Sequence, residues 1–416
     1  RTGRPGPVLI DVAKDVQNAR APFVYPESVD LPGYKPNYEG NRRQIKEAVK
    51  LINEAKKPLL MAGHGILLGK ATAELREFAE TTGMPVITTL LGISAFPEDH
   101  PLSLGMPGMH GWVHVNRAIQ ACDVLLCVGA RFDDRVTGKL DMFARNAKVI
   151  HIDIDPAEIS KNVRADVPIV GDAKQVLGML ADEVTPRDCA DWLAQIREIQ
   201  ATRSKKQLDP DNGMFMPHHV YAEFTKMLQG NFRVCTDVGQ HQMWAAQLID
   251  YYKPHTHITS GGLGTMGFAL PAGIGVQFAC PSEEVWTIAG DGGFQMNIQE
   301  LATVQQEGLP LKMLIINNGY LGMVRQWQEL FHERRYSATP MWSPDFVKVA
   351  EAYGIQAMRV DRAEDVAAAL ETARSTNGPF LIEFVVEREV NVYPMVAPGA
   401  SISDMYEEPE PAMAVV

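Results

Sequence analysis

Two short motifs combine residues suited to bind a divalent cation and phosphate. Gly290-Asp291-Gly292 follows the apolar run VWTIA, and 24 residues later Asn317-Asn318 follows LKMLII. Because the carboxyl ends of parallel strands share one edge of a sheet, Asp291 and Asn318 are expected to converge there as oxygen ligands. With the backbone carbonyl of Tyr320 they would form the protein's share of an octahedral Mg²⁺ site.

Glycines and a helix start accompany the acidic motif. Gly292 and Gly293 precede a predicted helix over residues 294–307, whose free amide groups are expected to face a diphosphate. Taken singly, each motif is common as a tight turn or a loop start. Their joint occurrence at two strand ends favours a site for a metal and a diphosphate.

Composition narrows the class of protein. The 416 residues carry a formal net charge of −12, with 46% hydrophobic and 22% charged residues. This is typical of a folded protein and disfavours a nucleic-acid or anionic-membrane partner. No apolar run approaches the roughly 18 residues of a membrane span. Five scattered cysteines without CxxC spacing disfavour disulfides or zinc and favour a reducing compartment such as the cytoplasm.

Strand and helix patterns alternate twice along the chain, which predicts an α/β fold with two parallel-sheet, three-layer domains. The predicted order is a remnant of a preceding domain (1–24) with a lone strand at 7–12, a linker (25–39), a central domain (40–184), a second linker with a short helix (185–213), a C-terminal domain (214–395) and a tail (396–416). The tail is expected to be mobile or to dock on the protein.

A weaker motif lies in the central domain. Gly63-His64-Gly65 follows the strand PLLMA, and Asp153 ends the strand KVIHI, which together indicate a dinucleotide cleft. The acidic residue lies 88 residues beyond Gly65, whereas a Rossmann fingerprint has it about 20 residues on. From the residues alone, a cleft and a purely structural role for these glycines are equal alternatives.

The GDG and NN motifs at this spacing match the thiamine-diphosphate motif, and the chain resembles the acetohydroxyacid synthase (acetolactate synthase) catalytic large subunit family almost from end to end. RFDDR with LGMVxQW narrows the resemblance to this family among thiamine enzymes. The matching segments are RTGRPGPVLIDVAKD (1–15), RFDDRVTGKL (131–140), HIDIDPAEI (151–159), DVGQHQMWAA (237–246), SGGLGTMGFALPA (260–272), GDGGFQMNIQELAT (290–303) and YLGMVRQWQ (320–328).

The resemblance implies three cofactors: thiamine diphosphate, Mg²⁺ and a mainly structural FAD. Mg²⁺ would be held by Asp291, Asn318 and the carbonyl of Tyr320, while Met266 would lie under the thiamine cofactor and keep it bent. The implied positions around thiamine diphosphate are Gln240, His241, Gly261, Gly262, Gly264, Met266, Gly290, Asp291, Gly292, Gly293, Asn318, Tyr320, Gly322 and Met323.

The implied FAD positions are spread over the central domain. His64 departs from the family, since many members have Gly there. The positions are Gly63, His64, Gly65, Thr89, Leu90, Leu91, Gly108, Met109, His110, Gly129, Arg131, Asp133, Arg135, Val136, Asp153, Ile154, Glu158, Gly171 and Asp172.

The implied activity is decarboxylation of pyruvate and transfer of the hydroxyethyl unit to pyruvate or 2-ketobutyrate, in branched-chain amino-acid biosynthesis. Arg135 would bind the carboxylate of the second keto acid, and Trp327 would shape the pocket for its ethyl group. Lys14 would lie at the channel mouth, and Met266 and Met323 complete the predicted catalytic set. From the residues alone, Arg135 is equally well a surface residue paired with a neighbouring aspartate, and Trp327 a helix core residue.

The family's pyrimidine-binding domain is expected to precede Arg1, so residues 1–416 alone are expected to be inactive. The implied partners are a second or further copies in a homodimer or homotetramer and a small regulatory subunit, in the cytoplasm or a plastid. Two alternatives stay open: another thiamine enzyme of the pyruvate oxidase or glyoxylate carboligase type, and an inactive fragment that serves as a binding or assembly module.

Overall fold

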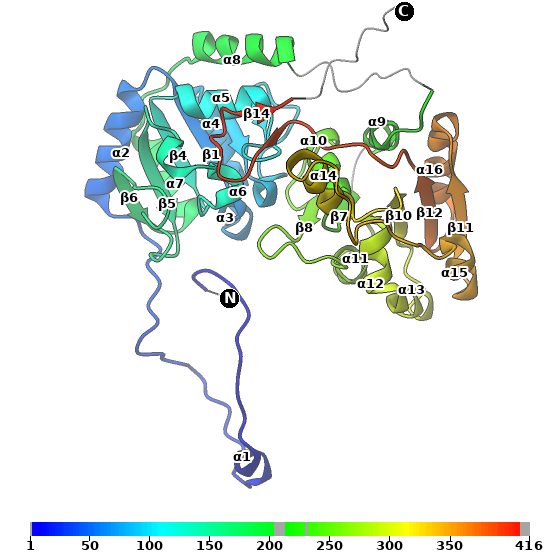
Figure 1. Ribbon diagram of the computed structural model, residues 1–416. Helices are drawn as coiled ribbons and strands as arrows, with labels where there is room; N and C mark the ends of the chain where they lie inside the picture. Colours follow the sequence, from blue (N-terminus) through cyan, green and yellow to red (C-terminus); the bar gives the residue numbers. More distant parts are fainter. Residues whose placement is uncertain (1, 204–212, 229–231, 408–416) are drawn as a thin grey trace, which may run out of the picture.

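The computed structural model describes residues 2–203, 213–228 and 232–407. Two α/β units follow one another along the chain (Figure 1). Most of the segment before Asn41 runs outside both units and carries the short helix α1 (Lys14–Asn18) at its far end, whereas Arg4 and Tyr38 near its two ends contact the first unit.

The first unit is built on a parallel sheet. In the described chain it has six strands in the order β3-β2-β1-β4-β5-β6. Strands such as PLLMA and VLLCV are apolar throughout and fully buried, as expected between two helix layers. The strands are β1 (Pro58–Ala62), β2 (Val86–Thr88), β3 (Ser103–Gly105), β4 (Val124–Val128), β5 (Lys148–Asp153) and β6 (Val167–Val170).

Helices cover both faces of this sheet. On one face lie α2 (Arg42–Glu54), α4 (Thr72–Thr82) and α7 (Ala173–Glu183), whose apolar sides form one core with the strands. On the other lie α5 (Val113–Ala121) and α8 (Ala190–Arg203). Short helices α3 (His64–Leu68), η1 (Leu90–Gly92), α6 (Asp134–Thr137) and η2 (Leu140–Met142) follow strand ends or connect elements.

The second unit repeats this plan. Its described part holds six parallel strands in the order β11-β12-β10-β9-β7-β8. The strands are β7 (Phe232–Thr236), β8 (His257–Thr259), β9 (Glu284–Gly290), β10 (Lys312–Asn317), β11 (Gln356–Val360) and β12 (Phe380–Val385). The predicted α/β class with two parallel sheets is therefore confirmed.

Its helices also form two layers. One layer is α9 (Pro217–Met227), α10 (Gln240–Leu248) and α16 (Val366–Ser375). The other is α11 (Ala269–Ala279), α12 (Asp291–Met296), α13 (Leu301–Gln306) and α15 (Phe346–Ala352). The remaining elements are η4 (Ile298–Glu300), α14 (Gly322–Phe331) and η5 (Ala363–Asp365).

Two predicted elements are wrong. Residues 7–12 form no strand, because no strand of the described chain lies beside them to complete a ladder, and Leu9 is 91% exposed. The predicted helix 294–307 is broken at Asn297, whose φ of −132° ends α12. The side chain of Asn297 donates instead to the carbonyl of Gly267 at 2.6 Å, a contact between distant segments.

The segments predicted as a linker and a tail dock on the first unit. Trp192 of α8 is buried and donates from Nε1 to the carbonyl of Pro58 at 3.1 Å. In the tail, β13 (Met395–Val396) pairs with β14 (Met405–Tyr406), and Ile402 joins the core of the first unit. The rest of the predicted tail, 408–416, lies outside the described residues. Among the described helices, none has the length and apolar character needed to cross a bilayer.

Candidate active site

Each sheet has a point where successive connections leave neighbouring strands in opposite directions, and a cavity opens at this point. In the first sheet this point lies between β1 and β4, and in the second between β7 and β9. Connections leave a sheet in opposite directions at such a point, which opens a crevice at the carboxyl ends of the strands. The residues singled out by the sequence motifs follow these strand ends.

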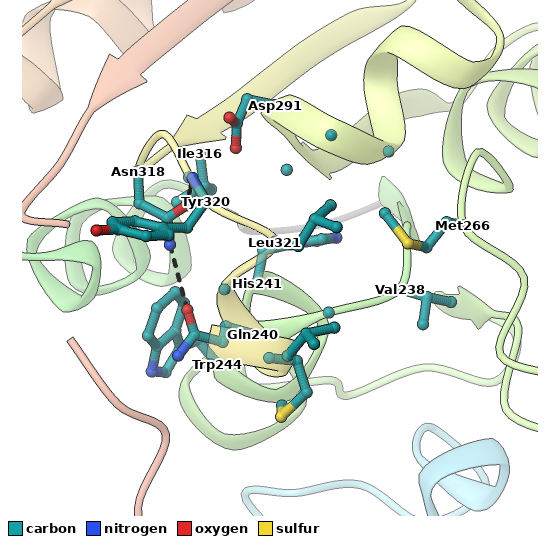
Figure 2. A pocket seen from close by; sticks show the side chains of 17 residues that line it. Val238, Gln240, His241, Trp244, Met266, Asp291, Ile316, Asn318, Tyr320 and Leu321 are labelled. Atoms are coloured by element: carbon teal, nitrogen blue, oxygen red, sulfur yellow. Dashed lines mark hydrogen bonds between the residues drawn. The ribbon is translucent and has the colours of Figure 1, made fainter. Parts of the chain in front are cut away.

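Asp291 and Asn318 converge at the second crevice (Figure 2). Asp291 is 1% exposed and begins α12 directly after β9. Its Oδ2 accepts a hydrogen bond from Ser343 Oγ at 3.0 Å, and its carboxylate also accepts from the backbone amides of Gly292 and Asn318. Burial nevertheless raises the pKa of Asp291 to about 6. A desolvated carboxylate whose own hydrogen bonds do not offset its burial fits a site for a cation.

Glycines line this crevice because larger residues do not fit. A Cβ at Gly292 would lie 2.9 Å from Leu321 Cδ2, and one at Gly322 would lie 2.1 Å from Gln240 Oε1. The first turns of α12 and α14 therefore present bare backbone to the cavity, which suits close approach of a diphosphate.

Asp237 ties the neighbouring loop to the crevice. Its carboxylate accepts from the backbone amides of Gly267 at 2.9 Å and Ala269 at 3.3 Å. A Cβ at Gly293 would lie 2.7 Å from Asp237 Oδ1. These contacts hold Met266, the residue before Gly267, against the cavity.

His241 also lines the crevice, as a neutral side chain. Burial lowers the pKa of His241 to about 4, so the imidazole is uncharged near neutral pH. Its buried Nε2 has no hydrogen-bond partner within the described residues. An orphaned polar atom at a cavity wall indicates a ligand or water as its partner.

A larger cavity of about 1070 Å³ adjoins the first. It is lined from both units, by segments that follow β1, β4, β5 and β6 and by the loop 260–264. Val238, Gly239, Met266, Met323 and Val324 line both cavities, so the two are continuous there. Trp327 lies in the wall of the larger one, half-buried, with its ring 5.7 Å from that of Phe331.

The floor of the larger cavity depends on glycine. Gly129 has φ of +64°, and a Cβ at Gly65 would lie 2.6 Å from the Cα of Gly129. Asp153 at the end of β5 is buried, which raises its pKa to about 6. His110 lines the cavity with a buried Nδ1 that has no partner among the described residues. A cavity of this volume, with a buried polar atom that has no partner in the described chain, fits a dinucleotide.

Most residues predicted for the cofactors lie in these two walls. In the smaller cavity are Gln240, His241, Met266, Gly290, Asp291, Gly292, Gly293, Asn318, Tyr320, Gly322 and Met323. In the larger are His64, Gly65, Thr89, Leu90, Leu91, Met109, His110, Gly129, Arg131, Asp133, Arg135, Val136, Asp153, Ile154, Gly171, Asp172, Gly261, Gly262 and Gly264. His64 Nδ1 lies 2.9 Å from the carbonyl of Leu91, so its side chain closes onto the protein.

Three residues predicted to contact FAD, Gly63, Gly108 and Glu158, are not among the described residues that line the larger cavity. A Cβ at Gly63 would lie 2.2 Å from the carbonyl oxygen of Gly129, and one at Gly108 would lie 2.2 Å from that of Arg135. Glu158 is paired with Arg4 Nη1 at 2.6 Å. Close packing and an ion pair account for their positions here, and their contact with FAD stays a prediction.

Two predicted catalytic residues lie in different surroundings, and their roles stay predictions. Arg135 reaches the larger cavity, but its side chain is 61% exposed and pairs with Asp134 at 3.0 Å. Lys14 lies on α1, apart from both units and both cavities (Figure 1). The segment that carries Lys14 has few contacts in this chain to place it.

Four residues around the cavities were not predicted as site residues from the sequence. Asp237 and Ser343 contact the glycines and Asp291, Arg4 reaches the larger cavity, and Gln326 packs behind Gln240. Arg4, Asp237 and Gln326 lie within the matching segments RTGRPGPVLIDVAKD, DVGQHQMWAA and YLGMVRQWQ, and this was the available signal for them.

Two thiamine-enzyme families match separate parts of the chain. The one described as "Thiamine pyrophosphate enzyme, central domain" matches residues 45–180. The one described as "Thiamine pyrophosphate enzyme, C-terminal TPP binding domain" matches residues 237–384, which include Asp291 and Asn318. The two matches fall on the two α/β units.

The chain is also similar to named proteins over nearly its whole length. It is 49% identical over 415 residues to the acetolactate synthase large subunit of Corynebacterium glutamicum, covering 97% of this chain and 66% of that protein. For the acetolactate synthase of Mycobacterium bovis the identity is 50% over 412 residues, with 96% and 67% covered. For the acetolactate synthase isozyme 2 large subunit of Escherichia coli K12 it is 44% over 412 residues, with 98% and 73% covered.

The chain thus spans about two thirds of the length of these relatives. Sequence identities of 44–50% over nearly the whole chain show common membership of one protein family. The match to the C-terminal thiamine-enzyme domain includes Asp291 and Asn318, which line the smaller cavity. The chain belongs to the acetolactate synthase large-subunit family and carries the thiamine-diphosphate-binding domain of that family.

Proposed function

We propose that this chain is the thiamine-diphosphate-binding part of an acetohydroxyacid synthase, which joins pyruvate to a second 2-keto acid. The observation that carries the proposal is the convergence of Asp291, Asn318 and the glycine-lined helix starts on one cavity that opens into a larger one. The first cavity suits a metal and a diphosphate, and the junction gives room for a small acid.

Mg²⁺ would be held by the carboxylate of Asp291, the side-chain oxygen of Asn318 and the carbonyl of Tyr320. This donor set is all oxygen, which magnesium prefers. The described residues hold no cluster of three His, Cys, Asp or Glu side chains suited to a metal, and the proposed set needs none, because it uses one carboxylate. The remaining ligands would come from the diphosphate and water.

Thiamine diphosphate, when bound, supplies an acidic thiazolium carbon and an electron sink for the loss of carbon dioxide. The protein would hold its diphosphate with the backbone amide of Gly293 and with neutral His241 as an uncharged donor, while the N–H of Gly292 stays on the carboxylate of Asp291. Met266 and Met323 would pack against the cofactor at the junction of the cavities, where they exclude water from the reacting centre.

The second keto acid would enter from the larger cavity. Arg135 can exchange its exposed partner Asp134 for a substrate carboxylate, because an exposed ion pair is worth little in water. Trp327 would bound the pocket for the side chain of the acceptor. Its position in the wall of the larger cavity supports a role in the choice between a methyl and an ethyl group.

FAD would occupy the larger cavity as a third cofactor. The support is its size, the glycine contact beneath it, and the unpartnered Nδ1 of His110. We further propose that the protein acts in the cytoplasm as a homo-oligomer with a small regulatory subunit, as the words "large subunit" in the names of its relatives suggest.

Product analysis tests the function. The protein that carries this chain would be supplied with thiamine diphosphate, Mg²⁺, FAD, pyruvate and 2-ketobutyrate, and the products identified by mass spectrometry. The expected products are acetolactate and acetohydroxybutyrate. Parallel reactions would contain inorganic phosphate and dioxygen with pyruvate, or glyoxylate in place of both keto acids. Acetyl phosphate in the first, or tartronate semialdehyde in the second, would contradict the proposal in favour of another thiamine enzyme. No product and no cofactor binding would favour a binding or assembly module.

A further inference from the structure

Three buried side-chain amides form a chain between the segment 390–395 and Asn318. Gln326 on α14 is 0% exposed, and its Oε1 accepts from the backbone N–H of Val392 at 2.8 Å. Its Nε2 donates to the backbone carbonyl of the same residue at 3.0 Å. A backbone N–H can only donate and a carbonyl can only accept. Val392 therefore fixes which end of the Gln326 amide is oxygen and which is nitrogen.

The same polarity passes to Gln240. Gln326 Oε1 also accepts from Gln240 Nε2 at 2.9 Å. Gln240 Nε2 donates in addition to the carbonyl of Val390 at 2.8 Å, which independently requires a nitrogen at this position. Both N–H groups of Gln240 are therefore used, and without the oxygen of Gln326 one of them would be buried with no partner and the amide would be held by Val390 alone.

Gln240 in turn orients Asn318. With its nitrogen directed at Gln326, Gln240 presents Oε1 to Asn318 and accepts from Asn318 Nδ2 at 3.2 Å (Figure 2). The amide of Asn318 must therefore turn its oxygen away from Gln240. That Oδ1 accepts from the backbone N–H of Tyr320 at 3.1 Å and keeps a second lone pair for a cation.

Burial makes this chain of bonds stringent. Gln240 is 2% exposed and Asn318 is 7% exposed, so water is poorly placed to replace a missing partner. An inverted amide would bring two oxygens or two N–H groups face to face, which costs more than a lost hydrogen bond.

We propose that Gln326 is a positioning residue, which acts through Gln240 to turn the oxygen of Asn318 toward the divalent cation. The inference rests on the proposed Mg²⁺ site. It adds that the cation site is oriented by the backbone of the segment 390–395, a segment that contributes no ligand to the proposed set.

The test compares three variants of the protein that carries this chain. Gln326→Met removes both polar ends at similar volume. Gln326→Glu keeps the oxygen that accepts from Val392 and Gln240, and because burial keeps this acid protonated, its O–H can donate to the Val392 carbonyl in place of Nε2. Gln277→Met is the matched control, since Gln277 is equally buried and donates to the carbonyls of Cys280 and Glu283, away from the cavity. The readouts are the Mg²⁺ concentration for half-maximal binding of thiamine diphosphate, followed by tryptophan fluorescence, and the Tm of the cofactor-free protein.

Gln326→Met is expected to raise the half-saturating Mg²⁺ concentration at least tenfold, and Gln326→Glu to stay within about threefold of wild type. Gln277→Met is expected to lower the Tm without changing the Mg²⁺ requirement. Unchanged Mg²⁺ binding in Gln326→Met, or equal shifts in Gln326→Met and Gln277→Met, would overturn the inference. Wild-type protein that binds the cofactor without Mg²⁺ would overturn the proposed function itself, and the inference with it.

If Gln326→Met does not fold, a second variant tests the step through which Gln326 would act, namely that Gln240 presents its oxygen to Asn318. Asn318→Asp adds a carboxylate, which by charge alone strengthens Mg²⁺ binding. The fixed Oε1 of Gln240 would then face a carboxylate oxygen, so the inference predicts Mg²⁺ binding at least tenfold weaker than wild type. Equal or tighter binding would overturn it.

Discussion

The backbones of Gly65 and Gly129 are in direct contact, since a Cβ at Gly129 would lie 2.5 Å from the Cα of Gly65. Gly129→Ala therefore forces two strand ends apart and places alanine at φ of +64°. We expect the free energy of unfolding to fall by at least about 2 kcal/mol, measured by urea unfolding. Gly178→Ala, in the middle of α7 with open space around it, is the control and is expected to gain roughly 0.5–1 kcal/mol. Equal responses would show that the contact has no energetic weight.

Asp237 is expected to be needed because both of its side-chain oxygens accept hydrogen bonds. Asp237→Asn turns an acceptor into an NH₂ group facing the backbone amides of Gly267 and Val238, so a buried donor loses its partner. We expect a loss of about 2 kcal/mol in stability and weaker binding of thiamine diphosphate, because Met266 shifts with the loop. The measurements are chemical unfolding and calorimetric titration. The exposed Asp182→Asn is the control, expected to change stability by less than about 0.5 kcal/mol. Unchanged stability and unchanged binding of thiamine diphosphate in Asp237→Asn would contradict the assigned role.

Glu98 joins the two units and makes stability depend on pH. Its Oε2 accepts from the backbone N–H of Tyr251 at 2.8 Å, and its own N–H donates to the carbonyl of Tyr251 at 3.2 Å. Burial, helped by the charge of Asp250, raises the pKa of Glu98 from 4.5 to about 8. Between these values the folded protein holds a proton that the unfolded chain has released, so stability falls as pH rises through this window.

Glu98→Gln mimics the protonated acid and removes this dependence. Relative to wild type, the variant is expected to be equally stable below about pH 4.5 and to gain up to about 1.4 kcal/mol per pH unit above it, levelling off near pH 8. Thermal unfolding of both proteins from pH 5 to 9 measures the difference. A constant difference across this range would show that Glu98 is ionised in the folded protein.

Trp327 is expected to govern the choice of acceptor. Trp327→Leu removes an aromatic ring from the wall of the larger cavity, so the ethyl group of 2-ketobutyrate loses the side chain against which it would pack. The ratio of acetohydroxybutyrate to acetolactate, at equal concentrations of the two keto acids, should fall at least about tenfold, within the 1–3 kcal/mol that one methylene contributes. Phe278→Leu on the outer side of α11 is the aromatic control and should leave the ratio unchanged. An unchanged ratio in Trp327→Leu would mean that another residue selects the acceptor.

Local patterns predicted much of the fold. The runs PLLMA, KVIHI, VWTIA and LKMLII correspond to β1, β5, β9 and β10, because central parallel strands are continuous apolar runs bounded by turns. β3 has only three residues, and β11 is an edge strand with partly exposed side chains, so neither has a strong apolar signal. The break at Asn297 depends on Gly267, which is distant in sequence, and no helical periodicity could reveal it.

The candidate site also has a part that the sequence predicts and a part that it does not. Asp291 and Asn318 follow strand ends, so topology alone places them at one edge of the sheet. The larger cavity is lined by loops from both units. Gly63 and Gly108 pack against Gly129 and Arg135 instead of lining it, and such contacts between distant segments cannot be predicted from local patterns. Gln326 looks like an ordinary helix residue until the segment 390–395 lies beside it.

Binding of thiamine diphosphate by wild type and by Asp291→Ala, titrated by calorimetry with and without Mg²⁺, tests the central claim most directly. The protein that carries this chain should bind the cofactor only with Mg²⁺. Asp291→Ala should weaken that binding at least about a hundredfold, equivalent to about 2.7 kcal/mol, with an unchanged circular dichroism spectrum. Binding that is independent of Mg²⁺, or equally tight in Asp291→Ala, would contradict the assignment of Asp291 and Asn318 as the centre of a metal–diphosphate site.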